Sequence, residues 1–217
     1  MRLRNQTYVY YFTVEGNSEQ LYLEHVKNLI DNEAERKHNV KFHIKQTNNI
    51  RKFFKNLANE NIDVYTHLWD KEADNKQEEF EAVLENIKMY SDADNIFCGY
   101  SNLAFELWLI LHKQPFNQQI ANKNDYLRTI NQLYNTNFKS HSELTESRHF
   151  NHVLSMISIS DVKNAIQNAK YLRQNKHNSN SKTVCITSKK SIRFFESNPD
   201  TLVYEIIEKI FKDCQLM

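Results

Sequence analysis

The chain has 217 residues, 40% of them hydrophobic, and its 28 Lys and Arg nearly balance its 27 Asp and Glu, for a formal net charge of +1. The mean hydropathy of −0.71 and the lack of any run near the ~20 apolar residues that span a bilayer argue against a membrane protein. The N-terminal residues lack the apolar region of a signal peptide, and the three cysteines are never close enough in sequence to predict a disulfide framework or a zinc site. We therefore expect a cytoplasmic protein without membrane association.

Four apolar or alternating runs predict β-strands, and helical spacing of apolar residues separates them. The strands are expected at residues 8–14, 40–46, 64–69 and 96–100. The helices are expected at residues 18–30, 50–57 and 80–87, the first of them capped by Ser18. This regular alternation predicts an α/β fold with a parallel sheet layered with helices.

The pattern changes after Tyr100. Residues 105–111 are apolar on most sides, which predicts a short buried helix, and residues 113–160 predict polar helices without a strand. The remaining segments are expected to be an exposed helix at 161–173, a loop at 175–182 and a last helix at about 200–213.

These elements suggest two parts. Residues 1–112 form the expected α/β core, and residues 113–217 form a mainly helical, basic C-terminal lobe whose last helix packs back on the core. No internal repeat divides the chain further.

Charge is distributed unevenly along the chain. Residues 60–106 hold twelve acids and three bases, whereas residues 151–193 hold eight bases and one acid. This asymmetry suits a cation-dependent enzyme that acts on a polyanion, and it equally suits two solvated helix faces of different sign. The candidate polyanion-binding residues are Lys163, Lys170, Arg173, Lys176, Lys182, Lys189, Lys190 and Arg193.

Glu15 and Gly16 lie at the turn from the first strand to the first helix. Gly16 is one of only two glycines in the chain, and glycine permits a tight turn and a close backbone approach that a Cβ would hinder. An acid at the carboxyl end of the first strand lies where open α/β sheets bind ligands. The alternative is an ordinary turn with a solvated Glu15.

Acids also follow the other strands. Asp70 and Glu72 follow the third strand, and Glu106 follows the fourth; in a parallel sheet these ends share one edge. Carboxylates that converge repel one another unless a cation lies between them, and oxygen ligands suit Mg²⁺ or Mn²⁺. Two nearby acids are possible supporting groups: Glu19, which also suits the helix dipole, and Asp74, which also suits a helix cap. Glu106 could instead pair with a basic residue.

Other residues carry weaker signals. His112, Trp69 and Trp108 are expected to be structural, and the spacing of His141, His149 and His152 does not indicate a metal site. The chain also lacks the Gly-x4-Gly-Lys-[Ser/Thr] motif, so it should not bind ATP through a P-loop.

Several of these motifs resemble a known family. The Glu15-Gly16-x-x-Glu19 motif followed by an acid-x-acid pair is similar to the Toprim domain of topoisomerases, primases and OLD-type nucleases. More narrowly, the chain resembles the RloB family, the Toprim nuclease partner of an ATPase in bacterial abortive-infection modules. The segments that carry this resemblance are EGNSEQLYL (15–23), LWDKEAD (68–74), YSNLAFELWLILH (100–112) and NPDTLVYEI (198–206).

The resemblance implies roles for the acids. Glu15 would be a metal ligand or general acid/base, Asp70 and Glu72 would be metal ligands, and Glu106 would complete the catalytic site. The chain departs from the pattern twice: Glu72 stands where Toprim domains usually have Asp, and Leu103 stands where RloB proteins commonly have Pro. The first departure bears on metal geometry, and the second on the start of the helix.

We therefore expect a Toprim-like, Mg²⁺- or Mn²⁺-dependent nuclease that acts as the toxic effector of an antiphage system. The resemblance favours RNA, tRNA included, over DNA as the substrate, and implies a partner ATPase of the ABC or AAA type encoded alongside. A homodimer is left open. The alternative is a non-catalytic Toprim scaffold that docks onto the ATPase or onto nucleic acid.

Overall fold

The computed structural model describes residues 6–47, 64–71, 81–83, 85, 96–176, 179–185 and 191–217. Within them, a five-stranded sheet is layered with helices, so the predicted α/β class is confirmed and the architecture is consistent with a Toprim-like fold. The predicted helix at 50–57 and most of the one at 80–87 lie outside the described residues. No helix in the described part of the chain is long and apolar enough to cross a membrane.

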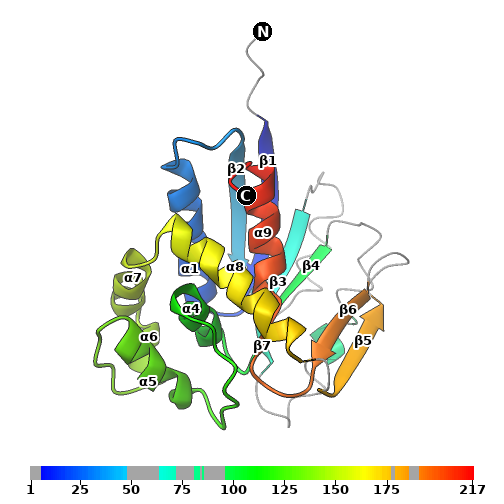
Figure 1. The fold of residues 1–217 in the computed structure, drawn as a ribbon. Helices are drawn as coiled ribbons and strands as arrows, with labels where there is room; N and C mark the ends of the chain where they lie inside the picture. Colours follow the sequence, from blue (N-terminus) through cyan, green and yellow to red (C-terminus); the bar gives the residue numbers. More distant parts are fainter. Residues whose placement is uncertain are drawn as a thin grey trace.

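The sheet contains all four predicted strands and one that the sequence pattern did not predict. Its order is β2-β1-β3-β4-β7, with the first four strands parallel and β7 antiparallel to β4 (Figure 1). The bounds are β1 (Thr7–Val14), β2 (Asn39–Gln46), β3 (Val64–Lys71), β4 (Ile96–Asn102) and β7 (Asp200–Thr201). The central strands β1 and β3 pair directly, so the residues that follow them lie at the same edge.

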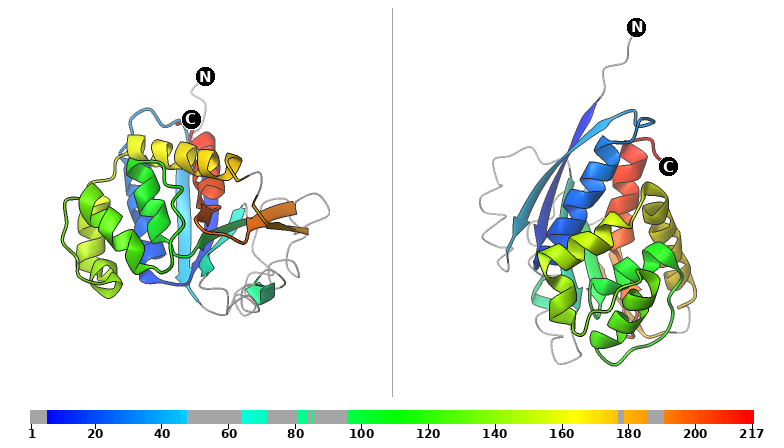
Figure 2. Two further views of the ribbon diagram at one scale, coloured as in Figure 1. Left: turned by 60° about the horizontal axis from the view of Figure 1, so that its bottom comes forward. Right: turned by 90° about the vertical axis from the view of Figure 1, so that its left-hand side faces the viewer.

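The larger helices lie on one face of this sheet (Figures 1 and 2). Helices α1 (Asn17–Asp31), α4 (Glu106–Lys113) and α9 (Val203–Asp213) pack on the strands, and α8 (Ile159–Gln174) packs across α4 and α9. The short helices that follow α4 are α5 (Asn124–Leu133), α6 (His141–Thr145) and α7 (Ser147–Ser155). One hydrophobic core includes residues from all of these helices, so it crosses the proposed boundary at residue 113, and the two-part division stays a prediction.

The helix predicted to be buried is α4, and its residues from Glu106 to His112 are all buried. His112 is structural, as expected: its Nδ1 donates to the Trp108 carbonyl at 2.7 Å and its Nε2 lies 3.1 Å from the Tyr22 hydroxyl. The expectation of an exposed helix at 161–173 was wrong for one face of α8. Val162, Ala165, Ile166, Ala169 and Leu172 are buried there, because small alanines complete an apolar stripe against α4.

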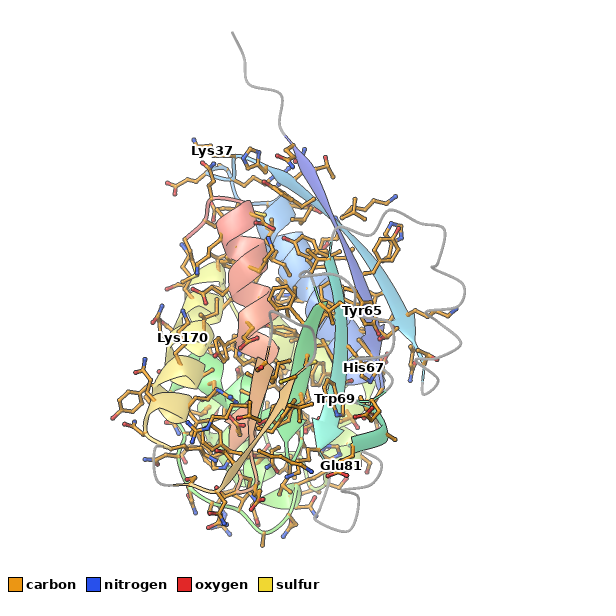
Figure 3. All side chains as sticks on the ribbon, turned by 90° about the vertical axis from the view of Figure 1, so that its right-hand side faces the viewer. Lys37, Tyr65, His67, Trp69, Glu81 and Lys170 are labelled. Atoms are coloured by element: carbon orange, nitrogen blue, oxygen red, sulfur yellow. The ribbon has the colours of Figure 1, made fainter. Side chains whose placement is uncertain are left out.

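Aromatic side chains line the other face of the sheet. Tyr65, His67 and Trp69 alternate along β3 and point away from the helices (Figure 3). The Thr13 hydroxyl lies 2.5 Å from Tyr65 Oη and 2.9 Å from His67 Nδ1. Burial lowers the pKa of His67 to about 3, so this histidine is neutral at pH 7 and serves the packing of the sheet.

A β-hairpin packs against this second face. Strands β5 (Ser181–Cys185) and β6 (Ser191–Phe195) are antiparallel, and Ile192 and Phe194 contact the side of the sheet that carries Tyr100. The expected loop at 175–182 therefore ends in a strand, and the mainly helical part of the chain after residue 113 also contains this hairpin. The side chains of β5 are mostly exposed, so its sequence lacks the apolar alternation that indicates a strand.

A buried ion pair joins the hairpin to the rest of the fold. Arg173 of α8 contacts both carboxylate oxygens of Asp200, at 2.6 and 2.7 Å, and Asp200 is fully buried. The Tyr100 hydroxyl also donates to Asp200, and Arg173 donates to the Arg193 carbonyl at 2.6 Å. The pair therefore connects α8, β4, β6 and β7.

We expect Arg173→Met to destabilise the protein by about 3–5 kcal/mol, because it leaves the Asp200 carboxylate buried without its charge partner. Urea unfolding at pH 7 measures the loss. Lys163→Met, the same kind of change on the same helix, is the control, and adding Asp200→Asn to Arg173→Met should restore part of the stability. A loss no larger than that of Lys163→Met would contradict this role of the pair.

Candidate functional site

A cavity of about 320 Å³ lies at the carboxyl ends of β1 and β3. Glu15 precedes α1, Glu19 lies in the first turn of α1, Asp70 is near the end of β3, and Glu106 is at the first position of α4. The cavity is completed by Gly16, Asn17, Ser18, Phe105, His141 and Thr145. Three of the four predicted catalytic acids, and the supporting acid Glu19, are thus brought together.

The parallel pairing of β1 with β3 explains this convergence. Val14, the last residue of β1, lies opposite Leu68, two residues before Asp70, so Glu15 and Asp70 lie near the same edge of the sheet. The backbone N–H of Asp70 donates to Glu15 Oε2 at 3.3 Å, which links the two strand ends directly. Glu72 and Asp74 lie outside the described residues, and their roles stay predictions.

Gly16 leaves space beside Glu19 rather than providing an unusual backbone conformation. Its φ of −125° is available to any residue. A Cβ at this position would lie 2.8 Å from Glu19 Oε2, so the Glu19 carboxylate, at the end of a flexible side chain, would have to shift. The glycine therefore lets the Glu19 carboxylate turn back against the backbone at the start of α1, which the Glu-Gly pair alone did not indicate.

Three buried carboxylate oxygens in the cavity have no hydrogen-bond partner among the described residues: Glu19 Oε2, Asp70 Oδ1 and Glu106 Oε2. Burying such an atom unpaired costs on the order of 1–3 kcal/mol, and more when it is charged. Burial, with the nearby Glu106 and Glu15, raises the pKa of Glu19 to about 7. Burial, with Glu19 and Glu106, also raises the pKa of Asp70 well above its ordinary value.

Two cations face these acids. His141 Nε2 of α6 lies 2.8 Å from Glu106 Oε1, and Lys123 Nζ lies 3.8 Å from Asp70 Oδ2. The hydrogen bond to Glu106 raises the pKa of His141. The alternative that Glu106 pairs with a basic residue therefore holds for one of its oxygens. Sequence spacing missed both cations, since Lys123 is far along the chain from Asp70 and His141 is far from Glu106, and the segment after α4 brings each to its partner.

The donor set suits a hard divalent cation. Three of the four unpaired buried side-chain atoms of the cavity are carboxylate oxygens, the ligand type that Mg²⁺ and Mn²⁺ prefer; the fourth is His141 Nε2, which lies 2.8 Å from Glu106 Oε1. No group of three His, Cys, Asp or Glu side chains is already positioned to hold a metal ion within the described ranges, which exclude Glu72. The described residues thus offer oxygens that fit a cation, without a complete ligand shell.

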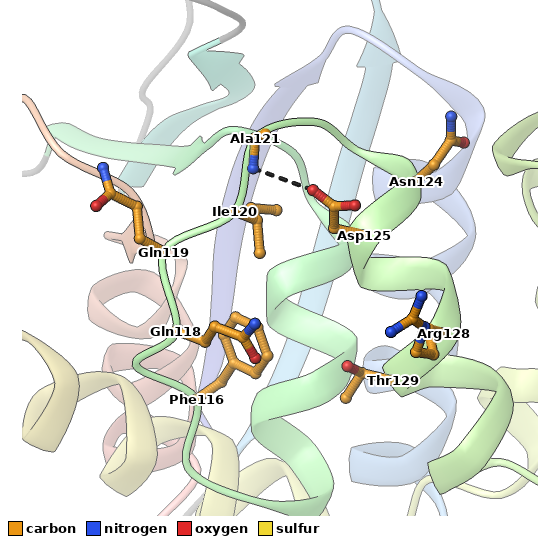
Figure 4. A pocket seen from close by; sticks show the side chains of 9 residues that line it. All are labelled: Phe116, Gln118, Gln119, Ile120, Ala121, Asn124, Asp125, Arg128 and Thr129. Carbon is orange, nitrogen blue, oxygen red and sulfur yellow. Dashed lines mark hydrogen bonds between the residues drawn. The ribbon is translucent and has the colours of Figure 1, made fainter.

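A second cavity, of about 300 Å³, lies between residues 116–121 and α5 (Figure 4). Asp125 Oδ2 accepts the backbone N–H groups of Ala121 and Asn122, each at 3.0 Å. The Asn122 side chain in turn accepts the N–H of Asn124 at 2.9 Å. These bonds hold the backbone on both sides of Lys123. The Lys123 side chain, which approaches Asp70, therefore extends from a well-held turn.

The predicted polyanion-binding residues differ in their burial and in their contacts. Arg173 is paired with Asp200, and Lys176 is buried, with Nζ 2.5 Å from the Ser197 carbonyl and 5.3 Å from the centroid of the Phe195 ring. These two charges therefore serve the fold.

The other predicted basic residues lie nearer the surface or outside the described residues. Lys170 pairs with Glu208 at 2.7 Å, Lys182 pairs with Glu81, and Arg193 donates to Ser181 Oγ at 2.8 Å. Lys163 is half-buried on α8. Lys189 and Lys190 lie outside the described residues, and a nucleic-acid role for the set stays a prediction.

The raised pKa of Glu19 predicts how stability depends on pH. In the metal-free protein, Glu19 keeps its proton between about pH 4.5, its ordinary pKa, and about pH 7, whereas the unfolded chain has lost it. The free energy of unfolding should therefore fall as pH rises through this window, by up to about 1.4 kcal/mol per pH unit from this residue.

Urea unfolding in a chelator, at pH values from 4.5 to 8, measures this dependence. Glu19→Gln should flatten the curve and raise stability at pH 8, because the amide carries no charge. Glu24→Gln, an exposed glutamate on the same helix, is the control. Identical pH curves for the native chain and Glu19→Gln would contradict the effect.

Comparison with known proteins gives a family for this chain. The sequence profile of the RloB-like protein family matches residues 10–210. No curated protein and no solved structure matches the chain. The matched range contains the four acids of the cavity and both cations that face them. Because the match covers most of the chain, the protein belongs to the RloB-like family.

Proposed function

We propose that this protein is a metal-dependent nuclease that hydrolyses nucleic-acid phosphodiesters. The observation that carries the proposal is the group of three buried, unpaired carboxylate oxygens in one cavity at the sheet edge. Such an arrangement is costly for the fold alone and favourable around a divalent cation. Membership of the RloB-like family is compatible with this activity.

In this proposal Asp70, Glu72 and Glu15 hold the metal, and Glu106 completes the site. The bound ion would supply charge stabilisation and an activated water for hydrolysis of the phosphodiester. The chain's own residues orient the acids: the Asp70 N–H fixes Glu15 Oε2, and His141 fixes Glu106 Oε1. Glu15 is exposed at the cavity wall, where its carboxylate can also exchange a proton with solvent.

The biological setting follows from the family resemblance. The nuclease would be the toxic effector of an antiphage abortive-infection system, kept inactive by a partner ATPase encoded alongside. RNA, tRNA included, is favoured over DNA as the substrate. The toxicity experiment described below tests this setting, and sequencing of the cleaved ends tests the substrate.

One observation favours a second candidate. Lys123 and His141 already balance part of the charge on Asp70 and Glu106, and Glu72 replaces the usual Asp of the acid-x-acid pair. A chain of this kind could serve as a non-catalytic scaffold that docks onto the ATPase or onto nucleic acid. The following two experiments separate the candidates.

The first experiment compares toxicity. The native chain, Glu15→Gln and Asp70→Asn are each induced together with the adjacent ATPase, and Glu24→Gln is the control. We expect the two site variants to lose toxicity while Glu24→Gln keeps it, because only the site variants remove a proposed ligand or proton-transfer group. Sequencing of cellular RNA and DNA ends identifies the cleaved polymer. Equal toxicity of all folded variants would exclude the nuclease.

The second experiment measures metal binding without activity. Mg²⁺ or Mn²⁺ should raise the melting temperature of the native chain, by an amount that corresponds to about 2.7 kcal/mol at a hundred times the dissociation constant. Asp70→Asn should abolish the rise, whereas Asp31→Asn, a surface acid paired with Lys27, should preserve it. A rise that survives Asp70→Asn would show that the metal binds elsewhere.

A further inference from the structure

Two basic side chains lie beside the acids of the cavity: His141 lines it, and Lys123 approaches Asp70. The carboxylates come from the sheet and from the starts of α1 and α4, whereas both cations come from the segment between α4 and α7. The Lys123 and His141 side chains are about one third exposed, at 32% and 31%, whereas that of Glu106 is only 3% exposed. Lys123 and His141 therefore lie on the more open side of Asp70 and Glu106, at the mouth of the cavity, where Glu15 is exposed as well.

The charge balance of the cavity requires cations for any anionic substrate. Glu15, Glu19, Asp70 and Glu106 place four carboxylates around one space, against Lys123 and His141. A nucleic-acid backbone brings a further negative charge for each phosphate. One divalent ion offsets only two of these four negative charges, so cations that face the incoming phosphate reduce the repulsion that remains.

The present contacts of the two cations can be exchanged. The 3.8 Å separation between Lys123 Nζ and Asp70 Oδ2 is an ion pair longer than a hydrogen bond. A divalent ion bound by the acids would neutralise Asp70 and Glu106, the present partners of Lys123 and His141. A phosphate oxygen could then replace these carboxylates as the partner of the two cations. The hydrogen bonds of Asp125 and Asn122 hold the turn that carries Lys123, so this side chain can move without its backbone.

The predicted basic surface is a weaker candidate for this role. Arg173 and Lys176 are committed to Asp200 and to Ser197, and Lys170 is paired with Glu208. None of these three residues lines the carboxylate cavity, and their contacts given above are not with its acids, whereas Lys123 and His141 pair with Asp70 and Glu106. Lys123 and His141 are therefore the better candidates for contact with the substrate, although neither belongs to the basic residues predicted from the sequence.

We propose that Lys123 and His141 are substrate-positioning residues that bind the phosphodiester backbone of a nucleic acid at the mouth of the carboxylate cavity. This inference rests on the proposed nuclease function and adds its substrate contacts. The phosphate lies between the two cations on one side and the metal-holding acids on the other. Sequence preference is not part of this contact, because phosphates are common to all nucleotides.

The test measures binding rather than cleavage. The full-length native chain is the parent, with Ca²⁺ in place of Mg²⁺ so that the probe is bound without being cleaved, and the probes are a labelled RNA hairpin with a single-stranded loop and its DNA counterpart. Adding Lys123→Met or His141→Gln to the parent should weaken binding about tenfold each, as expected for loss of a charged hydrogen bond. The slope of log affinity against log salt concentration should become shallower by about 0.7–0.9 for each lost phosphate contact.

Two controls separate substrate contact from structural damage. Lys123→Arg should restore affinity and slope, because it retains the charge. Lys139→Met removes an exposed lysine two residues before His141 and should change neither quantity. A structural defect at Asp70 or Glu106 would lower the melting temperature without removing one phosphate contact from the salt slope.

The outcomes are distinct. If folded Lys123→Met and His141→Gln variants keep the affinity and slope of the parent, the inference is overturned while the nuclease proposal stands. If the parent binds neither probe with Ca²⁺ and cleaves neither with Mg²⁺, the nuclease proposal itself fails, and this inference fails with it. A preference of the parent for the RNA hairpin over the DNA hairpin would identify the polymer.

Discussion

The crowding of carboxylates at one edge of the sheet is the constraint on which the rest of the site depends. Glu15, Glu19, Asp70 and Glu106 lie around one cavity, and three of their oxygens are buried without a hydrogen-bond partner in the described part of the chain. The parallel pairing of β1 and β3 creates this edge, and Gly16 leaves room for the Glu19 carboxylate. A fold selected for stability alone would neutralise or solvate these acids.

Two ways of neutralising the acids are combined in this molecule. Lys123 and His141 balance part of the charge on Asp70 and Glu106, and the remaining oxygens suit a divalent ion. Both basic side chains come from the segment after α4, so residues beyond the first four strands contribute directly to the cavity. In contrast, the buried pair of Arg173 with Asp200 lies on the hairpin side of the fold and uses its charge for structure.

Most predictions that depend on residues close together in the sequence are confirmed by the structure. The four parallel strands, the buried helix α4 and the structural role of His112 all follow from local periodicity. The convergence of Glu15, Asp70 and Glu106 could also be predicted, because strand ends in a parallel sheet share an edge. The hairpin and the buried face of α8 were missed, since exposed β5 side chains and small alanines weaken the apolar pattern.

The sequence by itself determined the fold class, the family motifs and the edge at which the acids meet, because these depend on short-range periodicity and on the rules of parallel sheets. Only the tertiary structure decided which charges face each other. It assigned Lys123 and His141 to the cavity and Arg173 and Lys176 to the interior, although all four are ordinary basic residues in the sequence. The physical reason is that an ion pair needs proximity in space, which the packing of helices far apart in the chain creates.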